Sequence, residues 1–389
     1  MNDDVMIVSA ARTPIGGFMG ALASLSASQL GAHAIGAALS RAGLAPESVD
    51  EVIMGCVLPA GQGQAPARQA SIGAGLPLGC GATTVNKMCG SGLKAVMLAH
   101  DALRAGSARV IMAGGMESMS NAPHLLPKAR AGLRMGDAVV QDHMFLDGLT
   151  DAYDKGRLMG SFAEDCAAAY GFSRALQDDF ALASLHRAQA ADFGWEIAPI
   201  TARVGKQDIV IGQDEQPRNA QPEKIPTLKP AFRDGGTVTP ANSSSISDGA
   251  AALLLMTRAT ADTLGATPLA RVVAHSTHAQ APALFTTAPV GAITKVLSRA
   301  GWQAADVDLY EINEAFAVVT MAAMKALNLS HDIVNIHGGA CALGHPIGAS
   351  GARILVTLLG ALRARGQSRG VASLCIGGGE AVAVAIEVM

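Results

Sequence analysis

Apolar and polar positions alternate in blocks at both ends of the chain: short apolar runs are separated by longer segments of helical character. In the first part, the pattern predicts strands at 5–8, 52–54, 83–85 and 110–112, and helices at 28–41 and 93–105. In the last part, it predicts strands at 270–274, 309–312, 333–336 and 371–375, and helices at 290–299, 318–327 and 349–363. This alternation is typical of an α/β fold with mainly parallel strands.

The two ends of the chain also share sequence. The letters LSRAG at 39–43 recur at 297–301, and each copy leads into a Val-Asp pair before a predicted strand. Farther on, the Ser-Gly pair at 91–92 aligns at constant offset with the pair at 350–351. An internal duplication is the simplest explanation, and it predicts two similar domains with an active site at their junction.

Between the two copies the pattern loosens, because charged residues and prolines interrupt it. We predict a loop-rich insertion that contains one clear amphipathic helix at 173–192, with Ser173 as its N-cap. The predicted organisation is an N-terminal half of residues 1–120 plus 242–266, a loop domain of residues 121–241 and a C-terminal half of residues 267–389. Long insertions of this kind often bind substrate.

Composition excludes several classes of protein. Half of the 389 residues are apolar, 16% are charged and the formal net charge is −3, so neither disorder nor nucleic-acid binding is expected. An apolar leader and an uninterrupted 18-residue apolar stretch are both missing from the sequence, which favours a soluble cytoplasmic protein without a membrane partner. The six cysteines are scattered without a CxxC pair, so we assign no metal ligands and expect most of them to be buried thiols.

Cys89 lies in the segment NKMCGSGL (86–93), which follows a predicted strand and opens a predicted helix. A helix N-terminus lowers the pKa of a thiol through the helix dipole and free backbone N–H groups, and the flanking glycines allow a substrate to approach closely. We therefore consider Cys89 a candidate nucleophile. The alternative is a small buried core residue.

His345 precedes the helix that the duplication makes equivalent to the Cys89 helix, and Pro346 restricts it to an extended conformation. The two would face each other across an approximate two-fold axis, so a Cys–His pair is a reasonable prediction. Cys375 ends a strand and enters the Gly-rich turn 377–379, which can present N–H groups to an oxyanion. Asn313 ends another strand, where it could orient a water molecule.

Together these four segments resemble the thiolase family, and the resemblance covers essentially the whole chain. Residues 86–93 resemble its nucleophile loop, 313–316 its asparagine motif, 343–351 its histidine motif and 375–379 its second-cysteine motif. The resemblance implies a duplicated αβαβα layered fold with a loop-rich insertion. The stretches 113–123 and 147–153 are most similar to the short-chain acetoacetyl-CoA members.

The resemblance also implies a reaction: the reversible condensation of two acetyl-CoA into acetoacetyl-CoA and CoA. Cys89 would carry the acetyl group, Cys375 would deprotonate the second acetyl-CoA, His345 would activate Cys89, and Asn313 would position a water. The N–H groups of Cys89 and Gly377 would hold the oxyanion. The CoA thioesters are substrates, and the implied reaction needs no metal or redox cofactor.

Further residues carried over from the family are those that contact CoA. They are Arg218 and Ser244, with Met159 and Phe316 beside the pantetheine arm. Two positions depart from the family pattern: Leu158 stands where a His is frequent, and the loop with Phe285 lacks a usual Met. The family assembles as oligomers, so a homotetramer with contacts from the loop domain is expected.

Three alternatives remain open. A 3-ketoacyl-CoA thiolase of broader chain-length specificity would carry the same motifs. A ketoacyl synthase would share the duplicated fold, but Cys375 stands where that family has a His. A non-enzymatic lipid carrier or scaffold would need none of the four motifs.

Overall fold

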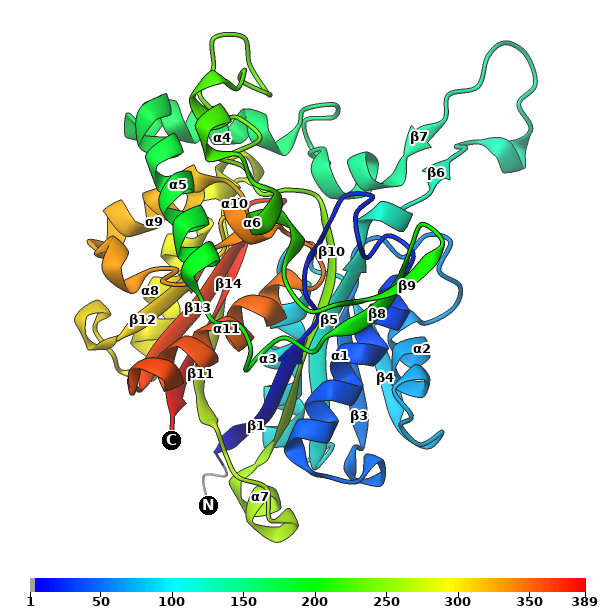
Figure 1. Ribbon diagram of the computed structural model, residues 1–389, viewed down its shortest axis with the longest axis vertical. Helices are drawn as coiled ribbons and strands as arrows, with labels where there is room; N and C mark the ends of the chain where they lie inside the picture. Colours follow the sequence, from blue (N-terminus) through cyan, green and yellow to red (C-terminus); the bar gives the residue numbers. More distant parts are fainter. Residues whose placement is uncertain (1–3) are drawn as a thin grey trace.

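The computed structural model describes residues 4–389 and consists of two similar halves that lie side by side (Figure 1). The N-terminal half contains β1 (Val5–Arg12), β2 (Gly16–Gly17), β3 (Glu51–Gly55), β4 (Gly81–Val85), β5 (Val110–Ser118) and β10 (Ser247–Thr257), with α1 (Ala27–Ala42), α2 (Pro66–Gly73), α3 (Ser91–Ala105) and α7 (Arg258–Leu264). The C-terminal half contains β11 (Ala270–Ala279), β12 (Leu309–Ile312), β13 (Arg369–Ile376) and β14 (Glu380–Val388), with α8 (Ala288–Ala300), α9 (Ala317–Leu327), α10 (Ala340–Leu343) and α11 (Ser350–Arg365).

The strands form one continuous sheet in the order β12-β13-β14-β11-β1-β10-β5-β3-β4, with β2 paired to β10. The halves meet where Met6 and Ile7 of β1 pair with two residues of β11. The two halves have the same topology, since β3-β5-β10-β1 of the first half corresponds to β12-β13-β14-β11 of the second. The counterpart of β4 is reduced to a single parallel bridge between Val334 and Tyr310. The duplication predicted from the sequence is therefore visible in the fold.

Two details of the prediction were wrong. Among the strand pairs of the large sheet that the structure describes, only β3–β4, β3–β5 and β12–β13 are parallel, and the others are antiparallel. The reason is that β10 and β14, which the pattern did not predict, run opposite to their neighbours. The predicted strand 333–336 is also missing, because Asn335 has a φ of 48° and its side-chain amide pairs with both the N–H and the C=O of Ile312, each at 2.8 Å.

Helices and sheet form five layers, as the apolar clusters demonstrate. One cluster joins α1 and α2 to the outer face of the N-terminal strands, another joins α8 to the outer face of the C-terminal strands, and the largest surrounds α3 and α11 between the two sheet halves. At Gly92 an added Cβ would lie 2.8 Å from the Ala352 nitrogen, and at Gly351 it would lie 2.4 Å from the Leu93 nitrogen. The starts of α3 and α11 therefore touch, which brings the segments before them together.

The repeated letters LSRAG form the same structure twice. They end α1 and α8, and each helix is capped by the glycine of the repeat, Gly43 and Gly301, with φ values of 65° and 71°. A left-handed glycine is the usual way to end a helix, so the repeat preserves a helix C-terminus.

The insertion between β5 and β10 contains β6 (His124–Leu125), β7 (Gln141–Asp142), α4 (Met159–Tyr170), α5 (Arg174–Ala190), β8 (Ile200–Val204), β9 (Gln207–Ile211) and α6 (Glu215–Asn219). The predicted helix is confirmed as α5, and the Ser173 hydroxyl accepts a hydrogen bond from the Leu176 N–H at 3.2 Å. The segment of β6 and β7 extends far from the body (Figure 1). Among residues 4–389, no helix has the length and apolar character needed to cross a membrane.

Candidate active site

A cavity of about 360 Å³ lies where the two halves and the insertion meet. The predicted catalytic residues Cys89, His345, Cys375 and Gly377 all line it. Three of the predicted CoA-contacting residues, Met159, Ser244 and Phe316, line it as well. The fold thus gathers residues from both halves and the insertion around one cavity.

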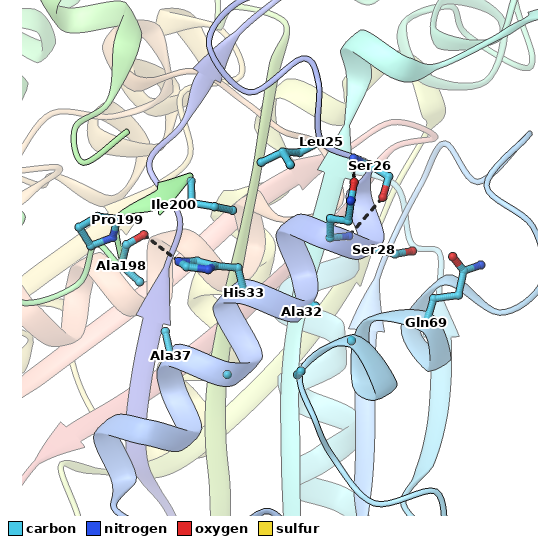
Figure 2. A pocket seen from close by; sticks show the side chains of 14 residues that line it. Leu25, Ser26, Ser28, Ala32, His33, Ala37, Gln69, Ala198, Pro199 and Ile200 are labelled. Carbon is cyan, nitrogen blue, oxygen red and sulfur yellow. Dashed lines mark hydrogen bonds between the residues drawn. The ribbon is translucent and has the colours of Figure 1, made fainter. Parts of the chain in front are cut away.

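A larger hollow of about 740 Å³ lies elsewhere, between α1, α2 and residues 198–200 (Figure 2). Its only imidazole, His33, places Nε2 3.3 Å from the Ala198 carbonyl oxygen, and none of the predicted catalytic residues reaches it. The 360 Å³ cavity is therefore the candidate active site.

Cys89 lies on a tight loop between β4 and α3. Met88, immediately before it, has a φ of 47°, an uncommon conformation for a residue with a side chain. The Ser91 hydroxyl stabilises this loop, since it accepts a hydrogen bond from the Lys87 N–H at 2.8 Å and donates one to the Met88 carbonyl at 2.6 Å. The strained turn lets Cys89 contribute to the cavity wall, and the residue as a whole is partly exposed.

The environment of Cys89 corrects one prediction. Burial raises the pKa of its thiol to about 11, although the backbone N–H groups of Gly377 and of Cys89 itself act in the opposite direction. The N-terminus of α3 therefore does not lower this pKa below its ordinary value, because removal from water outweighs the favourable dipole and hydrogen bonds. The same two N–H groups lie beside the sulfur, where an oxyanion formed on a Cys89 thioester would need donors.

His345 is held in one tautomer by its surroundings. Its Nδ1 lies 2.5 Å from the Ser350 hydroxyl oxygen, and that hydroxyl donates its own proton to the Pro346 carbonyl at 3.0 Å. With the hydroxyl proton donated to the Pro346 carbonyl, Nδ1 carries the imidazole proton and Nε2 keeps a lone pair, and Nε2 has no protein partner within residues 4–389. Burial, followed by the charge of Arg353, lowers the pKa of His345 to about 3, so the ring is neutral at physiological pH.

Cys375 is the last residue but one of β13 and is buried at the cavity wall. Burial raises the pKa of its thiol, and the neighbouring Cys89 raises it further. The turn that follows requires glycine, because Gly379 has a φ of 85° and an added Cβ would lie 2.5 Å from the Gln280 carbonyl oxygen. Gly377 begins this turn and places its N–H beside Cys89.

The remaining predicted residues have different positions. Ser244 anchors the residue before Phe316, since both its N–H and its hydroxyl donate to the Ala315 carbonyl at 3.0 Å. Asn313 is buried and does not line the cavity, although Ala315, two residues farther on, does. Neither side-chain polar atom of Asn313 has a protein partner in the described chain, an arrangement suited to a buried water. Arg218 is exposed on α6 and lines a separate hollow, so the structure does not bring it to Cys89.

Sequence reasoning missed Glu117. This fully buried carboxylate of β5 accepts hydrogen bonds from the N–H groups of Val57 at 2.9 Å, Leu58 at 3.1 Å and Gly348 at 2.9 Å. Gly348 belongs to the loop that carries His345 in the C-terminal half. Val57 and Leu58 belong to a loop of the N-terminal half that packs on Cys89, so Glu117 connects the two loops. A charged residue inside a strongly apolar strand was the available signal.

An aromatic cluster forms the apolar side of the cavity. Phe285 and Phe316 both line it, with ring centroids 6.4 Å apart. Phe162 packs edge-on against Phe285 at 6.2 Å but lies behind the lining. Leu158, the other departure from the family pattern, also lines the cavity.

The fold and the cavity define a class: a duplicated five-layer α/β enzyme with two cysteines and a neutral histidine at the junction of the halves. Family models agree, since residues 5–259 match the thiolase N-terminal domain and residues 266–388 match the thiolase C-terminal domain. The chain belongs to the thiolase family.

Several relatives match over their full length. The chain is 51% identical to an acetyl-CoA acetyltransferase from Cupriavidus necator, with 99% of each chain covered, and 50% identical to acetyl-CoA acetyltransferase 1 from Arabidopsis thaliana, with 99% of this chain and 94% of that one covered. A crystal structure of the Bacillus anthracis acetyl-CoA acetyltransferase matches with a TM-score of 0.96 and 38% identity, with all of both chains covered.

Proposed function

We propose that this protein is an acetyl-CoA acetyltransferase, which reversibly joins two acetyl-CoA molecules into acetoacetyl-CoA and CoA. The observation that carries the proposal is the meeting of Cys89, His345, Cys375 and Gly377 at one cavity. The names of the full-length relatives support the same acyl group and reaction.

In the first step, His345 Nε2 takes the proton of the Cys89 thiol as the sulfur attacks the carbonyl of acetyl-CoA. The bond from the carbonyl carbon to the CoA sulfur breaks, and the leaving sulfur takes the proton from Nε2, so acetyl-Cys89 and CoA form. The N–H groups of Cys89 and Gly377 stabilise the oxyanion of the intermediate, a contribution typically worth about 3 kcal/mol for each donor. A neutral histidine with a free Nε2 is the form this step requires.

In the second step, Cys375 as thiolate removes a proton from the methyl group of another acetyl-CoA. The carbanion attacks the acetyl-Cys89 carbonyl, a carbon–carbon bond forms and the bond to the Cys89 sulfur breaks. The proton on Cys375 then passes to the departing Cys89 thiolate, so that Cys89 is again a thiol and Cys375 is again the thiolate that began the step. This reaction needs no metal or redox cofactor.

Substrate binding extends this proposal. Met159, Ser244 and Phe316 line the cavity and are suited to contact the pantetheine arm of CoA. Arg218 is exposed and apart from the cavity, so its contact with CoA stays a prediction. A cytoplasmic location likewise stays a prediction.

For the assembly we propose a homotetramer. The segment from β6 to β7 exposes large apolar side chains, with Met135 96% and Val139 71% exposed. Such exposed apolar groups favour a protein interface. Light scattering of the full-length protein at micromolar concentration should give a tetramer, and a monomer would contradict the proposal.

Mass spectrometry with two variants tests the two chemical steps. With acetyl-CoA alone, Cys375→Ala should acquire one acetyl group on Cys89 but form no acetoacetyl-CoA, while Cys89→Ala should acquire none at that site. The assigned roles are wrong if Cys375→Ala, correctly folded by circular dichroism, cannot be acetylated.

A further inference from the structure

Two histidines and an aspartate converge at the surface between the two halves of the protein. Asp101 Oδ1 lies 2.8 Å from His275 Nε2 and 3.1 Å from His100 Nδ1. One potential ligand atom from each of the three residues lies within 4.8 Å of the others. We propose that these residues form a binding site for a divalent transition-metal ion, with Zn²⁺ the best fit.

The site exists because of the tertiary fold. His100 and Asp101 lie near the C-terminal end of α3, whereas His275 lies on β11, 174 residues beyond Asp101 in sequence. A β-bulge on β11 explains why His275 faces α3. Val272 belongs to the inner core around α3, but Ala274, after the bulge, belongs to the outer core around α8. The extra residue of the bulge reverses which positions of β11 face α3. His275 therefore faces α3, as Val272 does before the bulge.

The donor set is the one zinc prefers. Imidazole nitrogen and carboxylate oxygen bind Zn²⁺ at about 2.0–2.2 Å, and in a tetrahedral site such ligand atoms lie roughly 3.3 Å apart. The present separations of 2.8 and 3.1 Å are slightly shorter, as expected for nitrogens that now donate hydrogen bonds to Asp101. A small outward movement of the Asp101 side chain would admit the ion.

Metal binding requires each imidazole to present a lone pair where it now donates a proton. That proton moves to the other ring nitrogen, in exchange with solvent. For His275 the other nitrogen, Nδ1, is buried without a hydrogen-bond partner among the described residues, so the shift breaks no other hydrogen bond but leaves a buried N–H unpaired, which lowers the affinity for the ion. Solvent reaches the site through Asp101, whose side chain is 55% exposed, and it can supply the fourth ligand.

The site is separate from the catalytic cavity, because none of its three residues lines that space. His100 lies nine residues beyond Ser91, where α3 begins, or about 14 Å along the helix axis. An ion here would link α3 of one half to β11 of the other. Within residues 4–389, direct sheet pairing between the halves is confined to two residue pairs. Its expected effect is therefore on stability. The nearby positive charge of Arg104, which acts on His100, favours moderate rather than tight affinity.

Isothermal titration of the whole protein with Zn²⁺ tests the proposal, after iodoacetamide treatment to remove accessible thiols. One equivalent should bind with micromolar affinity, and Co²⁺ should give the visible absorption of a tetrahedral site. His275→Gln and Asp101→Asn should each weaken binding at least tenfold. His124→Gln, which alters an exposed histidine outside the cluster, should bind as the wild type does.

The variants also exclude a purely structural effect. Asp101→Asn changes a mostly exposed side chain, so it should fold even if His275→Gln does not. Zn²⁺ should raise the Tm of the wild type and of His124→Gln but leave that of Asp101→Asn unchanged. The proposal is overturned if the wild type does not bind Zn²⁺ saturably, or if Asp101→Asn binds it with unchanged affinity.

Discussion

Phe285 should limit the length of the acyl chain that the cavity accepts. Phe285 is 3% exposed, lines the cavity, packs against Phe316 and belongs to the same apolar cluster as Cys375, so the ring occupies space on the Cys375 side of the cavity. Phe285→Ala would remove this ring and open the apolar wall. The variant should accept a six-carbon ketoacyl-CoA better, relative to acetoacetyl-CoA, than the wild type does.

The magnitude follows from the volume released. A six-carbon chain adds two methylenes to acetoacetyl-CoA, and each buried methylene contributes about 0.8 kcal/mol. Burying both in the new space is worth about 1.6 kcal/mol, which corresponds to a roughly 15-fold increase in the ratio of kcat/KM for six-carbon over four-carbon substrate. Removal of a buried Phe also costs about 3–5 kcal/mol of folding stability, so assays belong well below the Tm of the variant.

Phe162→Ala is the matched control. Phe162 is 2% exposed and touches Phe285 edge-on, but it does not line the cavity. It should lose comparable stability without a change in the kcat/KM ratio. Thiolysis of four- and six-carbon ketoacyl-CoA measures both variants. Equal losses on the two substrates in Phe285→Ala would refute the reasoning, and a wild type equally active on both would favour the broader-specificity thiolase.

Three further predictions follow from the buried groups of the site. Iodoacetamide should modify Cys89 before the buried Cys56. Because the pKa of Cys89 is about 11, the rate of Cys89 alkylation should rise about tenfold per pH unit from pH 7 to 9, and a plateau of that rate below pH 9 would contradict this. Because the pKa of His345 falls from 6.5 to about 3 on folding, its stabilising contribution is present above pH 6.5 and lost as pH falls toward 3. Urea unfolding of the wild type should therefore lose about 1.4 kcal/mol per pH unit more than His345→Asn between pH 6 and 4, and parallel curves would disprove it. Glu117→Gln removes one carboxylate acceptor, so it should lower the free energy of unfolding by about 1–3 kcal/mol and reduce kcat. Glu47→Gln, at the surface, should change neither quantity. An unchanged kcat in Glu117→Gln would show that Glu117 does not position the site.

The sequence predicted most elements of the two halves, because their signals are local. The helix that ends at Gly43 and the one that ends at Gly301 carry a capping residue next to an apolar segment. The prediction of a strand at 333–336 was wrong because the Asn335 side chain, rather than the backbone of this segment, forms the hydrogen bonds to Ile312. Strand propensity does not predict such side-chain hydrogen bonds. β10 and β14 were missed although they are strongly apolar, and their directions depend on what they pair with.

For the site, the sequence by itself determined the chemical types and their order: a cysteine before one helix, a histidine before its duplicate, and a cysteine before a Gly-rich turn. Close contact at Gly92 and Gly351 decided that these segments meet. Only tertiary structure decided that Cys89 has a raised rather than a lowered pKa, that Glu117 joins the two halves and that His100 faces His275. The physical reason is that burial, charge and hydrogen bonding depend on groups distant in sequence, whereas residue type and helix capping are set within a few positions.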